Sequence, residues 1–333
     1  MFRRTIILAT ILATAACIQP ETSREQCDIL YQCVRVELGE SPSARQNKET
    51  LDFIFSELEL LNNVIHPDKI GGITRLNDRL GTGEWSSINP SLLQLTRDAR
   101  ALAEKSNNTF NPAIGKLINL WGFHRDPKQS ATLKLPSTRE ILALVNQNPS
   151  TEDIEFDGIR VRSKNPAVAI HYGLLYQGHI VRLVRAILND AGYRKASVFT
   201  NNMASSLGED IRYAHTQGAP GYRLNAGETL CHTEIEDHGF TENSHYYHSY
   251  LDPDTGFPAP TIRSVTVIDD DPMAAAGGCQ ALMSSDGRDW EITGNMMQLS
   301  AVELAWKNDL AARNDVMNDR IAAAVSQGNN LQQ

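Results

Sequence analysis

The segment HSYLDPDTGFPAPTIRSVTVIDDDPMAAAGGCQALM runs from His248 to Met283 and divides into a loop, a strand and a helix. Two prolines and a glycine between residues 251 and 258 predict an ordered, sharply turning loop. The alternating, β-branched run from Ser264 to Ile268 predicts a strand. Asp271 is a favourable N-cap and Pro272 suits the first helical position, so the small residues that follow predict a helix.

A second informative segment, TFNPAIGKLINLWGF, extends from Thr109 to Phe123. The side-chain oxygen of Asn111 can cap a helix whose first position is Pro112. Trp121 and Phe123 are large aromatic residues, which we expect in the hydrophobic core.

These two segments resemble the ApbE family, the FAD:protein FMN transferases. The loop is similar to the family pattern H-I-x-D-P-x-T-G-x-P, and the second segment is similar to G-x-F-D-P-x-x-x-x-L-x-x-L-W-G-F, with Asn111 in place of the aspartate. The resemblance covers nearly all of the chain after residue 16. It implies an α+β fold with mixed, mostly antiparallel sheets and flanking helices. It also implies a reaction in which FMN moves from FAD, with Mg²⁺, to a Ser or Thr of an exported flavoprotein.

Composition indicates an ordinary globular protein. The chain has 333 residues, of which 41% are hydrophobic and 21% charged, and it contains no internal repeat or low-complexity linker. We expect a single domain over residues 27–326, followed by a polar tail at 327–333. The net charge of −9 argues against non-specific nucleic-acid binding.

The N-terminus predicts export. Residues 1–16 combine two arginines with an apolar stretch too short to span a membrane, which is typical of a secretory signal peptide. The sequence TAAC ending at Cys17 resembles a lipoprotein cleavage box, so we expect a lipidated Cys17, a tether over residues 17–26 and a location at the periplasmic face of a bacterial membrane. An ordinary signal peptide with an incidental cysteine is the alternative. Cleavage before Cys17 would remove two positive charges and change the net charge from −9 to −11.

Four further cysteines, Cys27, Cys33, Cys231 and Cys279, do not determine their pairing by sequence alone. Cys27 and Cys33 are close enough to pair if the strand between them bends. The chain lacks a Cys-x-x-Cys motif, so neither a redox motif nor a zinc ribbon is indicated.

Hydrophobic periodicity predicts the remaining elements. We expect strands at Ile29 to Leu38, Ala167 to Ile170 and Ala196 to Thr200, a hairpin at Ile154 to Arg162, and helices at Thr50 to Val64, Ser91 to Lys105, Ser137 to Val145, Gly178 to Ala191 and Val302 to Ser326.

The family motif D-x-G-x-x-x-K-G corresponds to residues 171–178 here. Gly173 and Gly178 are kept, and they permit a tight turn and close backbone approach. The family aspartate is His171 and the family lysine is Gln177, so a cation that would offset a diphosphate is lost. The family's N-x-G-G-D motif corresponds to the region of Asn201, where its acid is missing.

In the loop, the family histidine corresponds to Ser249, and His248 stands one residue earlier. On an extended strand this offset directs the side chain to the opposite face, so His248 could take that role only across a bulge. The retained loop residues are flavin-binding positions by resemblance, although holding the loop would also explain them. Together with Gly173 and Gly178, these cofactor-binding candidates are Asn111, Asp252, Thr255 and Gly256.

The family's magnesium site is altered. Mg²⁺ prefers oxygen ligands in near-octahedral geometry. The family aspartate corresponds to Ala276, its threonine to Gln280, and its backbone carbonyl to that of Tyr176. The acids Asp269–Asp271 lie just upstream and could substitute, or Asp271 could simply cap the helix while the others are solvated.

Taken together, the substitutions at His171, Gln177, Ser249 and Ala276 favour an exported family member whose transferase activity is impaired or lost, a pseudoenzyme. One alternative is an active transferase with a rearranged site using His171, His248 and Asp269–Asp271. Another is a non-catalytic module that binds flavin or a protein partner. FAD is the expected ligand in each flavin-binding case, and the substitutions leave Mg²⁺ without its usual ligands.

Overall fold

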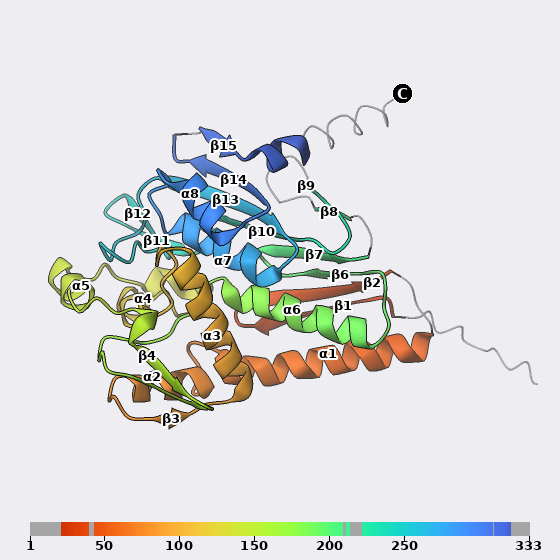
Figure 1. The fold of residues 1–333 in the computed structure, drawn as a ribbon, viewed down its shortest axis with the longest axis horizontal. Helices are drawn as coiled ribbons and strands as arrows, with labels where there is room; N and C mark the ends of the chain where they lie inside the picture. Colours follow the sequence, from red (N-terminus) through yellow and green to blue (C-terminus); the bar gives the residue numbers. More distant parts are fainter. Residues whose placement is uncertain (1–20, 40–42, 209–210, 214–221, 309, 321–333) are drawn as a thin grey trace, which may run out of the picture.

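The fold is built on an eight-stranded sheet in which every neighbouring pair of strands is antiparallel (Figure 1). The computed structural model describes residues 21–39, 43–208, 211–213, 222–308 and 310–320. In spatial order the strands are β1 (Ser23–Ile29), β2 (Gln32–Leu38), β6 (Ala196–Phe199), β7 (Met203–Leu207), β10 (Thr229–Glu234), β13 (Ile262–Asp269), β14 (Ala301–Trp306) and β15 (Ala311–Arg313).

Helices cover one face of this sheet. Helices α1, α6 and α7 lie along that face, and α3 and α8 pack against α7 (Figure 1). The opposite face is covered partly by Tyr222, Leu224 and Met317, which pack on the central strands. The helices are α1 (Ala44–Ile65), α2 (Gly72–Leu80), α3 (Pro90–Lys105), α4 (Gly115–Trp121), α5 (Thr138–Val145), α6 (Leu175–Asp190), α7 (Pro272–Met283) and α8 (Trp290–Met297).

Three smaller sheets complete the described part of the fold. They pair β3 (Ser86–Ser87), β5 (Arg160–Ser163) and β4 (Ile154–Asp157); β11 (Gly239–Glu242) and β12 (His245–His248); and β8 (Ile211–Tyr213) and β9 (Tyr222–Leu224). Helices and mostly antiparallel strands of this kind confirm the predicted α+β class. No helix among the described residues is long and apolar enough to cross a membrane.

Helix α7 forms as the sequence predicts. The side chain of Asp271 accepts a hydrogen bond from the Met273 amide, and Pro272 occupies the first turn. The helix is buried on nearly every side between the sheet, α6, α3 and α8. Gly277 and Gly278 allow this, because a Cβ at either position would press on a leucine from a neighbouring segment, Leu102 or Leu299.

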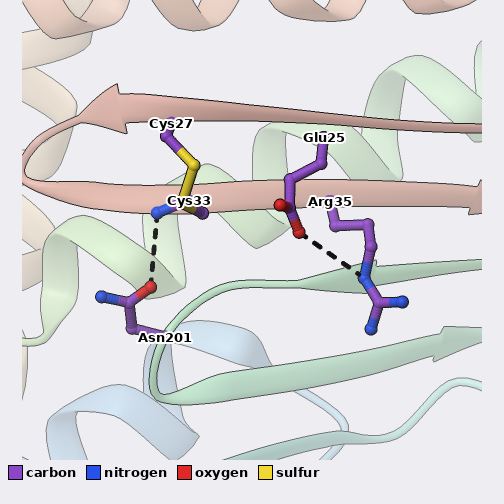
Figure 2. Close-up of a disulfide and its surroundings, with 5 residues drawn as sticks. All are labelled: Glu25, Cys27, Cys33, Arg35 and Asn201. Atoms are coloured by element: carbon purple, nitrogen blue, oxygen red, sulfur yellow. Dashed lines mark hydrogen bonds and ion pairs between the residues drawn. A yellow bond between two sulfur atoms is a disulfide. The ribbon is translucent and has the colours of Figure 1, made fainter.

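The predicted strand from Ile29 to Leu38 is wrong in its first part, because the chain reverses there into the β1–β2 hairpin. Asp28, Leu30 and Tyr31 have positive φ angles, and the Cys27–Cys33 disulfide joins the two strands at a Cα–Cα distance of 3.9 Å (Figure 2). The pairing that required a bend is therefore present. Residues 23–26 belong to β1, so the predicted tether over residues 17–26 extends too far into the fold.

Three other predictions need correction. Residues 302–306 form part of β14 and 311–313 form β15, because the edge of β13 supplies backbone partners that override the local pattern. Within the described part of the helix predicted over 302–326, residues 315–320 are helical. Residues 167–170 make only one isolated bridge, between Ile114 and Ala169. Asn111 does cap the Ala113 amide at 2.9 Å, but α4 begins later, at Gly115.

Several N- and C-terminal predictions lie outside the described residues. These are the signal peptide at 1–16, the lipidation of Cys17, the first part of the tether, and the polar tail at 327–333.

The placement of Trp121 gives a test of the core. Its side chain is 1% exposed, its Nε1 donates to the Gly256 carbonyl at 3.0 Å, and it stacks on Phe123. We expect Trp121→Ala to lower the free energy of unfolding by about 3–5 kcal/mol in chemical denaturation. The control Trp85→Ala removes a partly exposed ring beside two arginines and should cost about 1 kcal/mol. Equal losses would contradict the assignment of Trp121 to the core.

Candidate functional site

A cavity of about 250 Å³ opens where the β1–β2 hairpin, the N-terminus of α6 and the segment after α4 meet. A smaller adjoining cavity shares five of its lining residues, and we call the two together the cleft. The structure brings most of the predicted motif positions to this one place, although they come from distant parts of the sequence. The predicted positions that line the cleft are Asn111, His171, Gly173, Tyr176, Gln177, Ser249 and Gln280.

The turn at Gly173 lines both cavities of the cleft. Gly173 has a φ of +53°, and a Cβ there would overlap the side chain of Gln280. The Gln280 Oε1 accepts a hydrogen bond from the Leu174 amide at 3.1 Å, so α7 and the turn are joined directly. His171 Nδ1 accepts from the Gly173 amide at 3.3 Å, which leaves Nε2 as the protonated nitrogen of the neutral ring.

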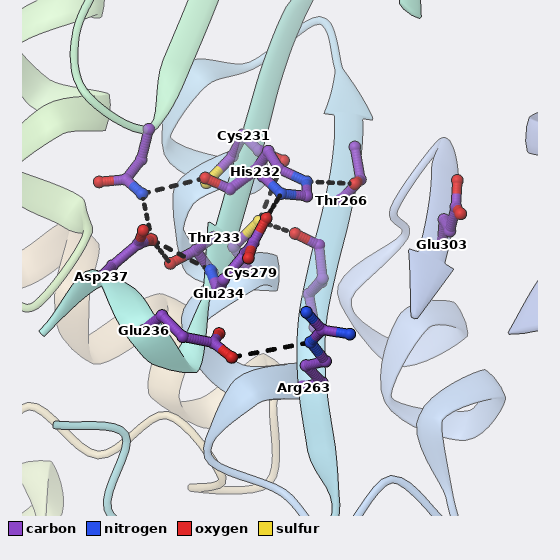
Figure 3. Close-up of polar contacts among 12 residues, drawn as sticks. Cys231, His232, Thr233, Glu234, Glu236, Asp237, Arg263, Thr266, Cys279 and Glu303 are labelled. Atoms are coloured by element: carbon purple, nitrogen blue, oxygen red, sulfur yellow. Dashed lines mark hydrogen bonds and ion pairs between the residues drawn. The ribbon is translucent and has the colours of Figure 1, made fainter. Parts of the chain in front are cut away.

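Gln177, at the family's lysine position, is hydrogen-bonded within the protein through both its oxygen and its nitrogen. Its Oε1 accepts from the Asn202 amide at 3.1 Å and from the Thr200 hydroxyl at 2.5 Å, and its Nε2 donates to Asn202 Oδ1 at 2.8 Å. Asn202 in turn donates to Asp237 at 2.7 Å. Asp237 also accepts from Thr233 and from the Glu234 amide (Figure 3). The lysine position is therefore part of a neutral amide network attached to a carboxylate.

Electrostatics of the cleft follow from burial of its imidazoles. Burial, aided by neighbouring histidines, lowers the pKa of His171 to about 3. Burial lowers the pKa of His238 to about 4 and holds that of His124 below its ordinary value. All three rings are thus neutral at pH 7. Among the lining residues of the described cleft, Arg125 is the one cation and Asp237 the one anion.

The altered magnesium positions do not fit the metal. The methyl group of Ala276 is buried against Gly178, where an added Cβ would lie 2.9 Å from it. Gln280 uses its oxygen on Leu174 and its nitrogen on Ser284. Within the described residues, the single group of three close metal-ligand side chains contains Cys27 and Cys33, whose sulfurs are joined in the disulfide. No Mg²⁺ chemistry is assigned to these positions.

The predicted substitutes lie elsewhere. His248 is 1% exposed, and its Nε2 donates to the Ala259 carbonyl at 3.0 Å, while Ser249 lines the cleft, so the one-residue offset does reverse the face. Asp271 caps α7, Asp269 accepts from the Ser300 amide, and none of the acids Asp269–Asp271 lines the cleft. The rearranged site suggested by the sequence is not assembled in this structure.

The retained loop residues hold the loop. Asp252 accepts from the Asp254 amide and the Thr255 hydroxyl, and Gly256 has a φ of +76° with its Cα against α5. Asp252, Thr255 and Gly256 do not line the cleft. Gly178 likewise serves packing of α6 on α7, so these four predicted cofactor-binding residues have structural roles here.

Sequence reasoning missed part of the cleft wall. His124 directly follows the W-G-F motif, so its position next to a recognised segment was the available signal. Tyr31 and Gln32 lie in the stretch predicted as a continuous strand, so the hairpin turn that brings them to the cleft was missed. The missed lining residues include Tyr31, Gln32, His124, Arg125, Asp237 and His238.

With this geometry in place, comparison with known proteins assigns the family. The chain belongs to the ApbE family, whose model matches residues 33–299. It is 26% identical over 316 residues to the FAD:protein FMN transferase of Rhodobacter capsulatus, covering 90% of this chain and 60% of that protein. It is also 26% identical over 194 residues to that of Klebsiella pneumoniae, covering 56% and 59%. The chain thus spans about three fifths of the length of these curated relatives.

Solved structures confirm the fold. The ApbE protein of Thermotoga maritima superposes with a TM-score of 0.79 at 22% identity, covering 90% of this chain and 99% of that one. The Pseudomonas stutzeri flavinyl transferase ApbE, in its apo form, gives 0.72 at 17% identity, covering 87% and 93%.

The Gln280 contact can be tested by stability. Gln280→Leu leaves the Leu174 amide without its acceptor in a residue that is 8% exposed. We expect a loss of about 1–3 kcal/mol in the free energy of unfolding, measured by chemical denaturation. Gln147→Leu, at an exposed glutamine, is the control and should change stability by less than about 0.5 kcal/mol. If Gln280→Leu has the same denaturation midpoint as the wild-type protein, the contact does not join α7 to the turn.

Proposed function

We propose that this protein is an exported member of the ApbE family that binds a flavin nucleotide in the cleft, with FMN-transferase activity impaired or lost. The observation that carries the proposal is the state of Ala276, Gln280 and Gln177. Each is neutral and already packed or hydrogen-bonded within the protein. The relatives named as FAD:protein FMN transferases support flavin as the ligand.

The chemical argument concerns charge. Breaking a diphosphate develops negative charge, and enzymes stabilise it with metals and fixed cations. Here the lysine position is an amide, the metal positions are a methyl group and an occupied amide, and the histidines are neutral. Binding of a flavin needs only a shaped, partly apolar pocket, and the cleft retains one.

Transfer activity gives the direct test. Incubated with FAD, Mg²⁺ and a target domain bearing the family's acceptor motif, this protein should give no covalent flavin fluorescence on a denaturing gel. We expect labelling at least about 100-fold slower than with the Klebsiella pneumoniae transferase as the control, because loss of even one stabilising contact can cost that much.

Efficient labelling would refute the proposal of lost activity. Flavin binding is measured separately by fluorescence titration, and failure to bind any flavin would refute the proposal that the cleft binds a flavin nucleotide. The converse variant combines Ala276→Asp, Gln280→Thr, Gln177→Lys, His171→Asp and Ser249→His. Gain of transfer by this variant would support the assignment of the motif positions.

Location is a separate proposal, supported by the sequence of residues 1–17. We propose that the chain is exported and anchored by a lipid on Cys17 at the periplasmic face of the membrane. After expression in a Gram-negative host, wild type should fractionate with membranes and Cys17→Ser with the soluble periplasmic extract. The control Cys279→Ser should behave as wild type. Equal solubility of wild type and Cys17→Ser would rule out the lipid anchor.

A further inference from the structure

Unpaired polar atoms are concentrated around the cleft. Over the described residues, nine buried side-chain nitrogen or oxygen atoms have no hydrogen-bond partner. Four of them belong to residues that line the larger cavity: Gln32 Oε1, His124 Nδ1, Tyr176 OH and His238 Nε2. A buried polar atom without a partner is unfavourable, and a small rotation of these four side chains toward the cavity would let a ligand's hydrogen-bonding groups satisfy them.

The chemistry of these atoms restricts the ligand. The Gln32 oxygen only accepts, the Tyr176 hydroxyl can donate or accept, and each neutral imidazole nitrogen does one or the other according to its tautomer. A matching ligand therefore carries both donors and acceptors. Aromatic rings in the same wall, those of Tyr31, Phe123 and Tyr176 among them, suit a planar ring system.

The charges of the lining residues also favour an uncharged ligand. Among the described residues, Arg125 and Asp237, both exposed, are the two charged residues that line the cleft. The buried imidazoles carry no charge at pH 7. The described part of the cleft thus offers little to offset the negative charge of a diphosphate.

We infer that the cleft recognises an uncharged planar heterocycle through its hydrogen-bonding edge, and so takes the flavin by its ring system and not by its diphosphate. The inference rests on the proposed flavin binding and adds which part of the flavin the cleft recognises. The flavin ring fits the requirement, because its pyrimidine edge places an N–H donor between two carbonyl acceptors. Riboflavin, which has no phosphate, should then be as good a ligand as FAD.

Titration of the wild-type protein with riboflavin, FMN and FAD, followed by flavin fluorescence, tests this. We expect the dissociation constants of riboflavin and FAD to differ by less than about tenfold, because one charge-assisted contact to phosphate would already exceed that ratio. ADP should not compete, and Mg²⁺ should leave both constants unchanged. FAD bound more than tenfold tighter, competition by ADP, or tightening by Mg²⁺ would overturn the inference while leaving flavin binding intact. Failure to bind any flavin would overturn the proposed function itself.

A matched pair of variants tests the role of the unpaired atoms. Tyr176→Phe removes an unpaired hydroxyl but keeps the ring, so it should weaken riboflavin and FAD alike, by about 2–12-fold, without lowering the melting temperature of the free protein. Tyr172→Phe removes a hydroxyl bonded to Thr96 outside the cleft. It should lower the melting temperature and leave flavin affinity unchanged. Wild-type affinity in Tyr176→Phe, or the same behaviour in both variants, would contradict the inference.

Discussion

The structure depends on the close approach of α7 to everything around it. The helix lies between the sheet, α6, α3 and α8, and contact is possible only because its residues are small. Gly178 on α6 lies against Ala276, and Gly277 and Gly278 leave room for two leucines. A larger side chain at any of these positions would push α7 outward. Gln280 lies on α7 and accepts a hydrogen bond from the Leu174 amide, so it would move with the helix. Core packing and cleft geometry therefore depend on the same close contacts.

A second constraint comes from the N-terminal hairpin, whose residues Leu30, Tyr31 and Gln32 line the cleft. Its tip has residues with positive φ angles, a backbone conformation that is unfavourable for residues other than glycine. The Cys27–Cys33 disulfide and Asn62, which binds both the Leu30 amide and the Asp28 carbonyl, hold the tip in place. The Cys33 amide donates to Asn201 Oδ1 at 3.3 Å, which joins the hairpin to the β6–β7 turn (Figure 2). A covalent link near residue 30 therefore stabilises the wall beside the β6–β7 turn.

In the cleft, neutral side chains with internal hydrogen bonds stand where the family resemblance implies charged groups. The family resemblance places a lysine at position 177 and metal ligands at 276 and 280. Here an amide network and close packing occupy these places, so the turn is held without a cation. Four polar atoms of residues in the cleft wall have no hydrogen-bond partner within the described protein. Glycines and prolines specify the turn and charged side chains specify the family's reaction, so the two can vary separately.

The sequence by itself determined the family, the α+β class and the main local elements, because glycine, proline and capping residues act over a few positions. Asp271 and Pro272 start α7 and Ser137 starts α5 as expected. Only the tertiary structure decided that His248 faces away from the cleft, that residues 302–306 join the sheet between β13 and β15, and that residues such as Tyr31 and His238 complete the wall. These facts depend on which segments meet in space, and pairing between residues far apart in sequence leaves no local pattern to recognise.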